Sequence, residues 1–233
     1  MNSELFKSYL LENEVKIFQK LQTILKQLNY FSNLTKLIDN EDYWIMQVYD
    51  SIWPFFKNSQ KVFDNQRFID IGSGCGFPGI AYAIIHPHSE VYLVDSSKKK
   101  TNALKEIVNK LNLPNKIYVI HNRIENIAHK PEYRNKFDLG TTRAVSIPST
   151  VAEYLIPILN SEGKGLLYCG RWEAKDKKNL QTSLSKLNGS IIDIQRRSLP
   201  NLRGERHAIF IGKLGNCPEI YPRGNGKPKK YPL

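Results

Sequence analysis

The chain has 233 residues, of which 41% are hydrophobic and 24% charged, a composition typical of a folded globular protein and not of a disordered chain. No apolar run approaches the roughly 20 residues that cross a bilayer, and the first residues lack the basic and apolar parts of a secretory leader, so we expect a cytoplasmic protein. Three separated cysteines and five histidines without ligand spacing argue against a disulfide framework and predict no metal site.

Charge is distributed unevenly along the chain. The 34 Lys and Arg residues exceed the 22 Asp and Glu residues, which gives a formal net charge of +12, and the excess lies after residue 64. Such a surface attracts polyanions over about a Debye length, roughly 8 Å at physiological salt. RNA, DNA and an anionic membrane surface are compatible partners, and charge that serves only solubility is the alternative.

Residues 1–64 are expected to form a helical extension. Apolar residues recur at spacings of three and four over 10–28, which predicts an amphipathic helix there. A second helix is predicted over 40–53, because two acidic residues directly after Asn40 suit a helix N-terminus.

From Arg67 the pattern changes to alternating strands and helices. Strands are predicted at 68–71, 91–94, 116–121, 137–142 and 165–169, and helices at 80–85, 98–111, after 123, and at 147–159 and 174–187. This alternation implies a parallel sheet, and two final strands joined only by a loop, 191–197 and 207–213, imply an antiparallel addition at its edge. We therefore predict a Rossmann-like α/β domain over 65–215, with a mainly parallel seven-stranded sheet and an antiparallel last strand. Residues 216–233 are expected to form a basic tail without regular structure.

A glycine-rich segment follows the first strand of this domain and precedes a helix. It reads Asp70-Ile71-Gly72-Ser73-Gly74-Cys75-Gly76-Phe77-Pro78-Gly79. Open α/β sheets bind nucleotide-like ligands at this place, and glycine lets the backbone turn tightly and approach a ligand closely. Asp95 ends the next strand, where a carboxylate can accept both hydroxyls of an adenosine ribose. The pattern predicts a nucleoside cofactor, and a structural turn beside a solvated aspartate is the alternative.

The position of the glycines distinguishes two nucleoside cofactors. A dinucleotide fingerprint requires glycine at positions 72, 74 and 77, but residue 77 is Phe. Asp70 adds negative charge beside the loop, which suits a cofactor that is cationic at sulfur and at its amino group. The sequence therefore favours S-adenosylmethionine, and an NAD-linked oxidoreductase is the alternative.

With these features the sequence resembles the RsmG (GidB) family, bacterial-type methyltransferases that place a methyl group on N7 of a guanine in small-subunit ribosomal RNA. The matching segments include Phe68–Ile80, Leu93–Ser96, Asn122–Glu125, Thr142–Ala144 and Gly204–His207. The resemblance implies a class I methyltransferase domain, S-adenosylmethionine as cofactor, and 16S ribosomal RNA, in the small subunit or its precursor, as partner. Gln47 departs from the family pattern, which usually has His there, and Cys169–Trp172 stands where Lys-Gly is frequent.

The resemblance also implies roles in cofactor binding. The methionine end of the cofactor is assigned to Gly72, Gly74, Gly76 and Phe77, the ribose to Asp95, and the adenine to Ile124 and Glu125. For the last two residues, an apolar core contact beside a surface acid is the alternative.

Arginines are the candidates for the substrate side. Arg143 ends the fourth strand beside the expected position of the methyl group, and it is the candidate catalytic residue that grips the target base or its phosphate. A surface salt bridge is the alternative. Arg123 and Arg206 are candidate RNA contacts, with a structural ion pair as the alternative, and Arg171 supplies positive charge where the family has Lys.

The expected chemistry needs little acid–base help. Guanine N7 carries a free lone pair at neutral pH, so its attack on a sulfonium methyl requires no general base. Adenine amino methylation favours an Asn- or Asp-Pro-Pro-aromatic turn, whereas this chain has Thr142–Ala144, and cytosine carbon methylation needs a cysteine near the fourth strand. The resemblance implies a guanine-N7 methyltransferase, and we expect a monomer without a membrane partner. Methylation of another RNA base and a catalytically silent RNA-binding protein are the alternatives.

Overall fold

The computed structural model describes residues 9–32, 34–57 and 60–233, so residues 1–8, 33, 58 and 59 of the predicted extension lie outside the described part. Both predicted helices of this region are present. The first is α2 (Glu12–Ser32), and the second is a continuous helical run formed by α3 (Asn40–Asp42), the π-helical Tyr43–Tyr49, α4 (Asp50–Ile52) and the 3-10 turn Trp53–Phe55. An antiparallel strand pair that was not predicted follows, β1 (Phe56–Lys57) with β2 (Gln60–Lys61).

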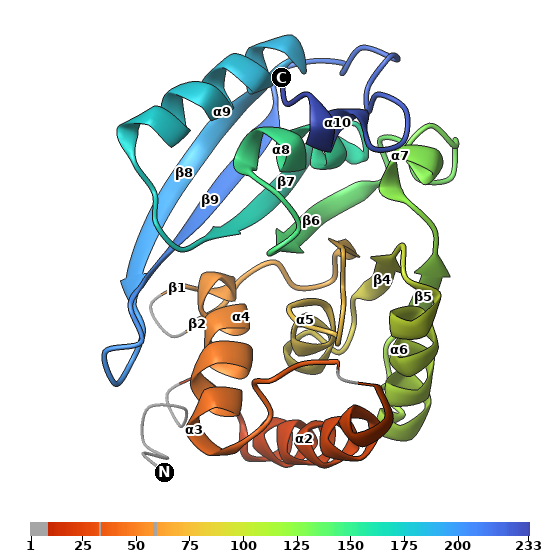
Figure 1. Ribbon diagram of the computed structural model, residues 1–233, viewed down its shortest axis with the longest axis vertical. Coiled ribbons are helices and arrows are strands. Elements are labelled where there is room, and N and C mark those ends of the chain that lie inside the picture. Colours follow the sequence, from red (N-terminus) through yellow and green to blue (C-terminus); the bar gives the residue numbers. More distant parts are fainter. Residues whose placement is uncertain (1–8, 33, 58–59) are drawn as a thin grey trace.

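A seven-stranded sheet lies at the centre of the remaining described chain (Figure 1). Its strands are β3 (Arg67–Ile71), β4 (Glu90–Asp95), β5 (Ile117–His121), β6 (Phe137–Arg143), β7 (Leu159–Cys169), β8 (Gly189–Ser198) and β9 (Glu205–Lys213), in the spatial order β5-β4-β3-β6-β7-β9-β8. The neighbours from β5 to β7 pair in parallel, and β9 pairs antiparallel with both β7 and β8. The predicted Rossmann-like fold is confirmed. The two final strands form the predicted antiparallel addition at one edge of the sheet, where β9 lies between β7 and the edge strand β8.

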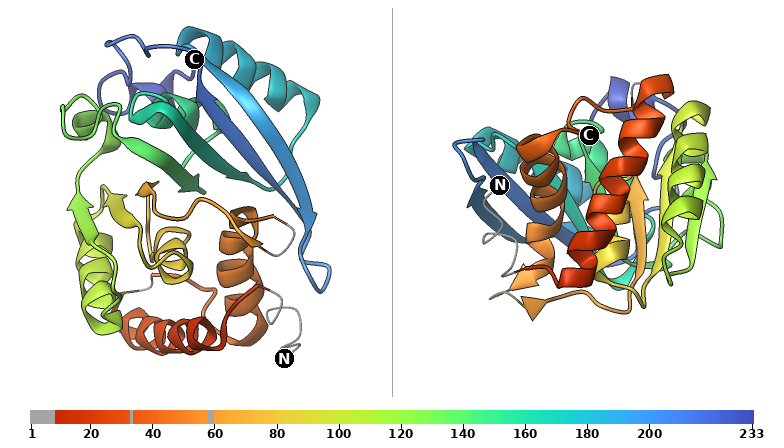
Figure 2. Two further views of the ribbon diagram at one scale, coloured as in Figure 1. Left: turned by 180° about the vertical axis from the view of Figure 1, so that it is seen from behind. Right: turned by 90° about the horizontal axis from the view of Figure 1, so that it is seen from below.

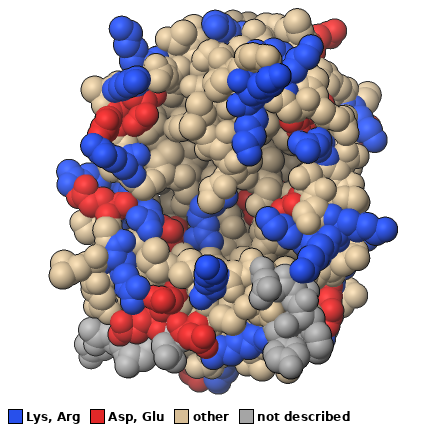
Figure 3. Space-filling model, viewed as in Figure 1, with Lys and Arg blue, Asp and Glu red and all other residues tan. Residues whose placement is uncertain are grey.

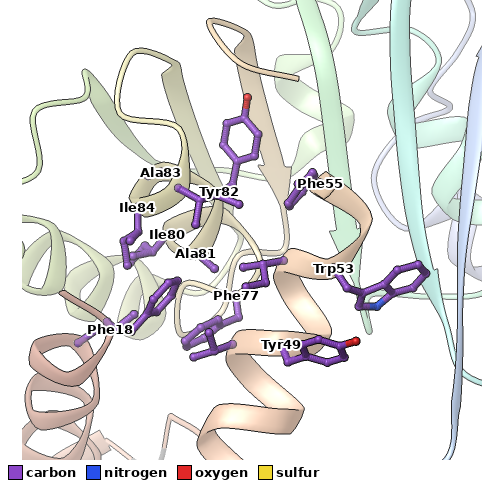
Figure 4. Close-up of a cluster of buried hydrophobic side chains, with 14 of the residues drawn as sticks. Phe18, Tyr49, Trp53, Phe55, Phe77, Ile80, Ala81, Tyr82, Ala83 and Ile84 are labelled. Carbon is purple, nitrogen blue, oxygen red and sulfur yellow. The ribbon is translucent and has the colours of Figure 1, made fainter. Parts of the chain in front are cut away.

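Helices cover both faces of the sheet (Figure 2). One face carries α2, the helical run 40–55, α5 (Gly79–Ile85) and α6 (Lys98–Leu111), and the other carries α7 (Ile124–Ile127), α8 (Pro148–Leu155) and α9 (Ala174–Lys186). Each face has its own hydrophobic core, the first under α2, α5 and α6 and the second under α7, α8 and α9. Successive strand residues point to opposite faces, so Phe68 lies in the first core and Ile69 in the second. In the first core, the Phe55 and Tyr82 rings lie 5.1 Å apart and join the N-terminal helices to α5 (Figure 4). The extension is therefore held against the sheet by a shared core.

Two segments differ from the sequence expectations. α8 ends at Leu155 and β7 begins at Leu159, because Leu159 pairs with Phe137 before a bulge in the ladder. The polar residues in this bulge interrupt the apolar pattern, which is why the sequence alone predicts the strand only from Gly165. The tail was expected to lack regular structure, and this is wrong over α10 (Lys227–Lys230), which contacts α8.

The strand order reverses direction at β3. β4 and β5 lie on one side of it, and β6, the next strand in sequence, lies on its other side. Such a switch point opens a crevice at the carboxyl ends of the strands, where open α/β sheets bind their ligands. Within the described residues, the structure has no helix that combines the length and the apolarity needed to cross a membrane.

Candidate active site

The glycine-rich loop between β3 and α5 has a backbone that favours glycine. Gly72, Gly74 and Gly76 have φ angles of +75°, +56° and +102°, a region that other residues adopt only with strain. The Gly72 amide donates to the Val94 carbonyl at 2.8 Å, which ties the loop to β4. A Cβ atom at Gly72 would lie 2.4 Å from Val145 Cγ2. Residue 72 therefore requires glycine for space as well as for conformation.

Asp70 is a buried residue that holds the end of this loop in place. Its side chain is fully buried, its Oδ2 accepts from the Gly79 amide at 3.0 Å, and its Oδ1 accepts from Thr141 Oγ1 at 3.1 Å. Burial raises the pKa of the Asp70 carboxyl to about 6, although these hydrogen bonds act in the opposite direction. Asp70 thus joins the start of α5 to β6 and does not lie among the cleft-lining residues.

A cleft of about 340 Å³ opens at the carboxyl ends of β3, β4 and β6. Five residues predicted from the sequence line it: Gly72, Asp95, Arg123, Ile124 and Glu125. It is also lined by residues that the sequence analysis did not assign to the cofactor, among them Lys100, Val145, Tyr154 and Lys229. Figure 3 shows a hollow near the middle of this face, with Lys and Arg side chains around it.

Asp95 is fixed at this cleft by backbone donors. Its Oδ2 accepts from the Gly74 amide at 2.9 Å, and its Oδ1 accepts from the Ser97 amide at 2.8 Å. Ser97 is also the N-cap of α6. A carboxylate has about four acceptor positions, so Asp95 keeps capacity for two further donors such as ribose hydroxyls. The residues present therefore fit an adenosine-containing cofactor.

Glu125 lies on the side of the cleft that residues 122–125 form. Glu125 is 5% exposed. Its Oε1 accepts from Tyr154 Oη at 3.3 Å and from the Gly226 amide at 3.1 Å. Burial raises the pKa of Tyr154, and the Glu125 carboxylate raises it further, so the phenol stays protonated and keeps donating. Ile124, at the start of α7, is buried beside it.

An arginine cluster, defined as Gln47, Asp50, Arg143 and Arg206, lies between the helical run 40–55 and the sheet. Arg143 donates to the Met46 carbonyl at 3.1 Å, to Asp50 Oδ2 at 3.5 Å and to Gln47 Oε1. Arg206 Nε donates to the same Asp50 oxygen at 3.3 Å. Burial raises the pKa of Asp50, and the two guanidinium groups offset this effect only in part.

The arginine cluster adjoins the glycine-rich loop. Gln47 Nε2 lies 3.8 Å from the Cys75 sulfur, and the Arg143 guanidinium carbon lies 5.9 Å from the centre of the Phe77 ring. Phe77 itself is buried and packs edge-on against Tyr43, among the side chains of the N-terminal helices and α5 (Figure 4). Its side chain therefore faces the core and not the cleft.

The predicted substrate arginines do not all lie together. Arg123 is exposed and lines the cleft, whereas Arg143 and Arg206 lie in the arginine cluster. Arg171 is exposed after β7, forms an ion pair with Glu173 at 2.5 Å, and lines a separate hollow of about 380 Å³ beside Trp172. Among the residues that the structure describes, no group of three or more His, Cys, Asp or Glu residues is arranged to hold a metal ion.

Sequence reasoning missed parts of the cleft wall. Tyr154 and Lys229 belong to no motif, and their place depends on how α8 and the tail pack on the domain. Lys100 belongs to a run of three lysines after Asp95, a pattern that is typical of a solvated helix face. Its position in the first turn of α6, directly after the predicted ribose residue, is the one signal that points to the cleft.

Solved structures resemble the fold at low sequence identity. The Bacillus subtilis M1A22 tRNA methyltransferase TrmK has a TM-score of 0.50 and 13% identity, covering 65% of this chain and 61% of that chain. The precorrin-6y C5,15-methyltransferase of Geobacter metallireducens GS-15 has a TM-score of 0.50 and 11% identity, covering 77% of this chain and 91% of that chain. At these identities the likeness concerns the fold alone.

Sequence relatives are far more similar. A protein of Prochlorococcus marinus strain MIT 9515 named ribosomal RNA small subunit methyltransferase G is 56% identical over 220 residues, which cover 94% of this chain and 92% of that protein. A protein of the same name from strain NATL1A is 44% identical over 222 residues, covering 95% and 90%. The family model GidB, described as rRNA small subunit methyltransferase G, matches residues 14–207. The chain therefore belongs to the rRNA small subunit methyltransferase G family.

Proposed function

We propose that this protein is an S-adenosylmethionine-dependent methyltransferase that acts on N7 of a guanine in 16S ribosomal RNA, as a cytoplasmic monomer. The observation that carries the proposal is the fixed carboxylate of Asp95, held by the Gly74 and Ser97 amides at the cleft beside β3. The names of the relatives support ribosomal RNA as substrate. The net charge of +12 fits a polyanionic substrate.

The cleft offers a complementary group for each part of the cofactor. Asp95 accepts the ribose hydroxyls, Ile124 and Glu125 bind the adenine, and the glycine-rich loop, of which Gly72 lines the cleft, accommodates the methionine end. We infer indirect roles for two residues assigned to the cofactor from sequence. Asp70 holds the loop through the Gly79 amide. Phe77 supports the loop from the core through its contact with Tyr43.

The chain's task in the reaction is orientation. When bound, S-adenosylmethionine supplies a methyl group on a sulfonium, which the free lone pair of guanine N7 can attack without loss of a proton. Holding two reactants in line is worth up to about 7–11 kcal/mol in favourable cases. We assign to Arg143 the grip on the target base or its phosphate, because it ends β6 directly before cleft-lining residues 144–146.

The other arginines serve the RNA backbone in this proposal. Arg123 at the cleft and Arg171 beside the second hollow are both exposed, so their guanidinium groups are accessible to phosphates. Arg206 shares Asp50 with Arg143 and adds positive charge at the same place. Phosphate contacts of this kind position a nucleic acid and make its binding depend on salt.

A labelling experiment tests the function. The protein is incubated with methyl-labelled S-adenosylmethionine and either naked 16S ribosomal RNA or small subunits that lack the modification, and the labelled nucleotide is mapped. We expect label at N7 of one guanine. Label on another base would instead support the alternative that the enzyme methylates a different RNA base. Calorimetry provides the control, since S-adenosylhomocysteine should bind and NADH should not. RNA binding without uptake of S-adenosylhomocysteine would instead indicate a silent RNA-binding protein.

A further inference from the structure

The C-terminal segment 221–230 packs beside the cleft. The Gly226 amide donates to Glu125 Oε1 at 3.1 Å, and Lys229 lines the cleft. α10, within this segment, lies beside α8 (Figure 1). We propose that the ion pair between Arg223 and Glu153 locks this segment onto α8 and thereby positions Glu125 and Lys229 for the adenosine part of the cofactor. This inference rests on the proposed function, because it takes the cleft as the cofactor site.

The lock is a two-point contact between the Arg223 guanidinium and the buried Glu153 carboxylate. Glu153 has no exposed side-chain surface; its Oε1 accepts from the Arg223 amide at 2.8 Å and from Arg223 Nε at 2.9 Å, and its Oε2 accepts from the terminal Nη2 at 2.7 Å. Planar two-point contacts between guanidinium and carboxylate are strong and directional. A buried carboxylate without its partner is strongly destabilising, so Glu153 holds Arg223 in place. Arg223 is consequently committed to the fold and is not free to bind phosphate.

Several further bonds hold the neighbouring backbone. Arg134 donates to the Tyr221 carbonyl at 2.8 Å, a His129 ring nitrogen lies 2.8 Å from the Pro222 carbonyl oxygen, and Thr150 Oγ1 donates to the Pro228 carbonyl at 3.0 Å. All three acceptors are main-chain oxygens. The domain therefore fixes the path of the backbone here, which is what brings the Gly226 amide to Glu125.

One turn of α8 serves both the lock and the cleft. Thr150 and Glu153 hold the tail, and the next residue, Tyr154, donates to Glu125 at 3.3 Å. Glu125 is thus oriented by a donor from α8 and a donor from the tail. If the docked tail favours cofactor binding, then the bound cofactor must favour the docked tail by the same factor, because coupling between two binding equilibria is reciprocal.

Hydrogen exchange on the full-length protein tests this coupling directly. We expect saturating S-adenosylhomocysteine to slow amide exchange over 221–230, including at Gly226. A tail with a purely structural role would exchange equally fast with and without the ligand. The measurement needs no variant, so it stays informative even if changes at the lock impair folding.

Substitution of the lock gives the second test. Arg223→Met should raise the Kd for S-adenosylhomocysteine about tenfold and raise the KM for the cofactor while leaving the KM for ribosomal RNA unchanged, and Arg223→Lys should restore part of the affinity. Arg196→Met is the matched control, because it breaks an exposed Arg–Glu pair with Glu205 away from the cleft and should leave the Kd unchanged.

Two results would overturn the inference in different ways. If the unmodified protein binds S-adenosylhomocysteine but exchange over 221–230 is unaffected and Arg223→Met binds with the original Kd, the tail is not coupled to the cofactor. If the unmodified protein takes up no S-adenosylhomocysteine at all, the proposed function itself fails, and the role of the tail fails with it.

Discussion

Asp70→Asn separates the structural role of a buried carboxylate from its charge. The Asp70 carboxylate accepts from the Gly79 amide at 3.0 Å and from Thr141 Oγ1 at 3.1 Å. An asparagine in the same place can keep both contacts, because its oxygen accepts from the amide and its NH₂ group donates to the threonine hydroxyl, which also accepts. We therefore expect the variant to fold and to keep the glycine-rich loop in place.

The expected effect is a change in how stability depends on pH. Burial raises the pKa of Asp70 from 3.8 to about 6. A difference of about two units at 1.36 kcal/mol per unit corresponds to roughly 3 kcal/mol. Because the folded state holds the proton more tightly than the unfolded state, this contribution is fully present below pH 3.8 and is lost as the pH rises through about 6. The substituted amide has no proton to lose, so the variant gains on the original protein by that amount over this range.

Urea denaturation of both proteins measures the difference. Tryptophan fluorescence reports unfolding, since the chain has three tryptophans. Other titrating groups occur in both proteins and cancel when the two free energies of unfolding are subtracted at each pH. A difference that stays constant from pH 4 to pH 7.5 would refute the reasoning. The affinities for S-adenosylmethionine and for S-adenosylhomocysteine at pH 7.5, measured on the same samples, show whether the charge of Asp70 also assists the cationic cofactor, because only S-adenosylmethionine carries a sulfonium.

Three further substitutions test the loop, the ribose site and the substrate side. Gly72→Ala should lower the free energy of unfolding in urea clearly more than Gly74→Ala does. Both variants incur about 1–3 kcal/mol of backbone strain, but only Gly72→Ala places a Cβ atom 2.4 Å from Val145 Cγ2. Equal losses would contradict this. Asp95→Ala should weaken S-adenosylhomocysteine binding at least about tenfold by calorimetry, and unchanged affinity would remove Asp95 from the site. Arg143→Ala should lower methyl transfer to ribosomal RNA while cofactor still binds, and full activity would exclude its substrate role.

The sequence predicts well what depends on short stretches of chain. Gly72 and Asp95 were predicted from their positions at strand ends, Glu125 was assigned from the family resemblance, and all three line the cleft. Parallel strands end at one edge of a sheet, so residues directly after them meet without any knowledge of side-chain packing. The tight turn of the glycine-rich loop follows from an equally local rule, because it depends on residue type alone.

Side-chain direction and long-range packing were beyond this kind of prediction. Phe77 follows the glycines in sequence, yet its ring turns toward Tyr43 of the N-terminal extension. Tyr154 and Lys229 reach the cleft from α8 and the tail, which contact each other only in the folded chain. A pattern of proline, glycine and lysine predicts an unstructured tail, because the pattern contains no information on the buried Glu153 that holds it.

The arginine cluster shows why a structural ion pair and a substrate contact are compatible at Arg143. One carboxylate, Asp50, faces two guanidinium groups, at 3.5 Å from Arg143 and 3.3 Å from Arg206, so the three charges sum to a net positive charge. Burial still raises the pKa of Asp50, which means that ion pairing only partly offsets its loss of solvation. A phosphate or an electron-rich base edge that approaches can therefore share the guanidinium groups with Asp50. Because Met46 and Asp50 belong to the helical run 40–55, the N-terminal extension fixes the orientation of Arg143, and it forms part of the candidate site.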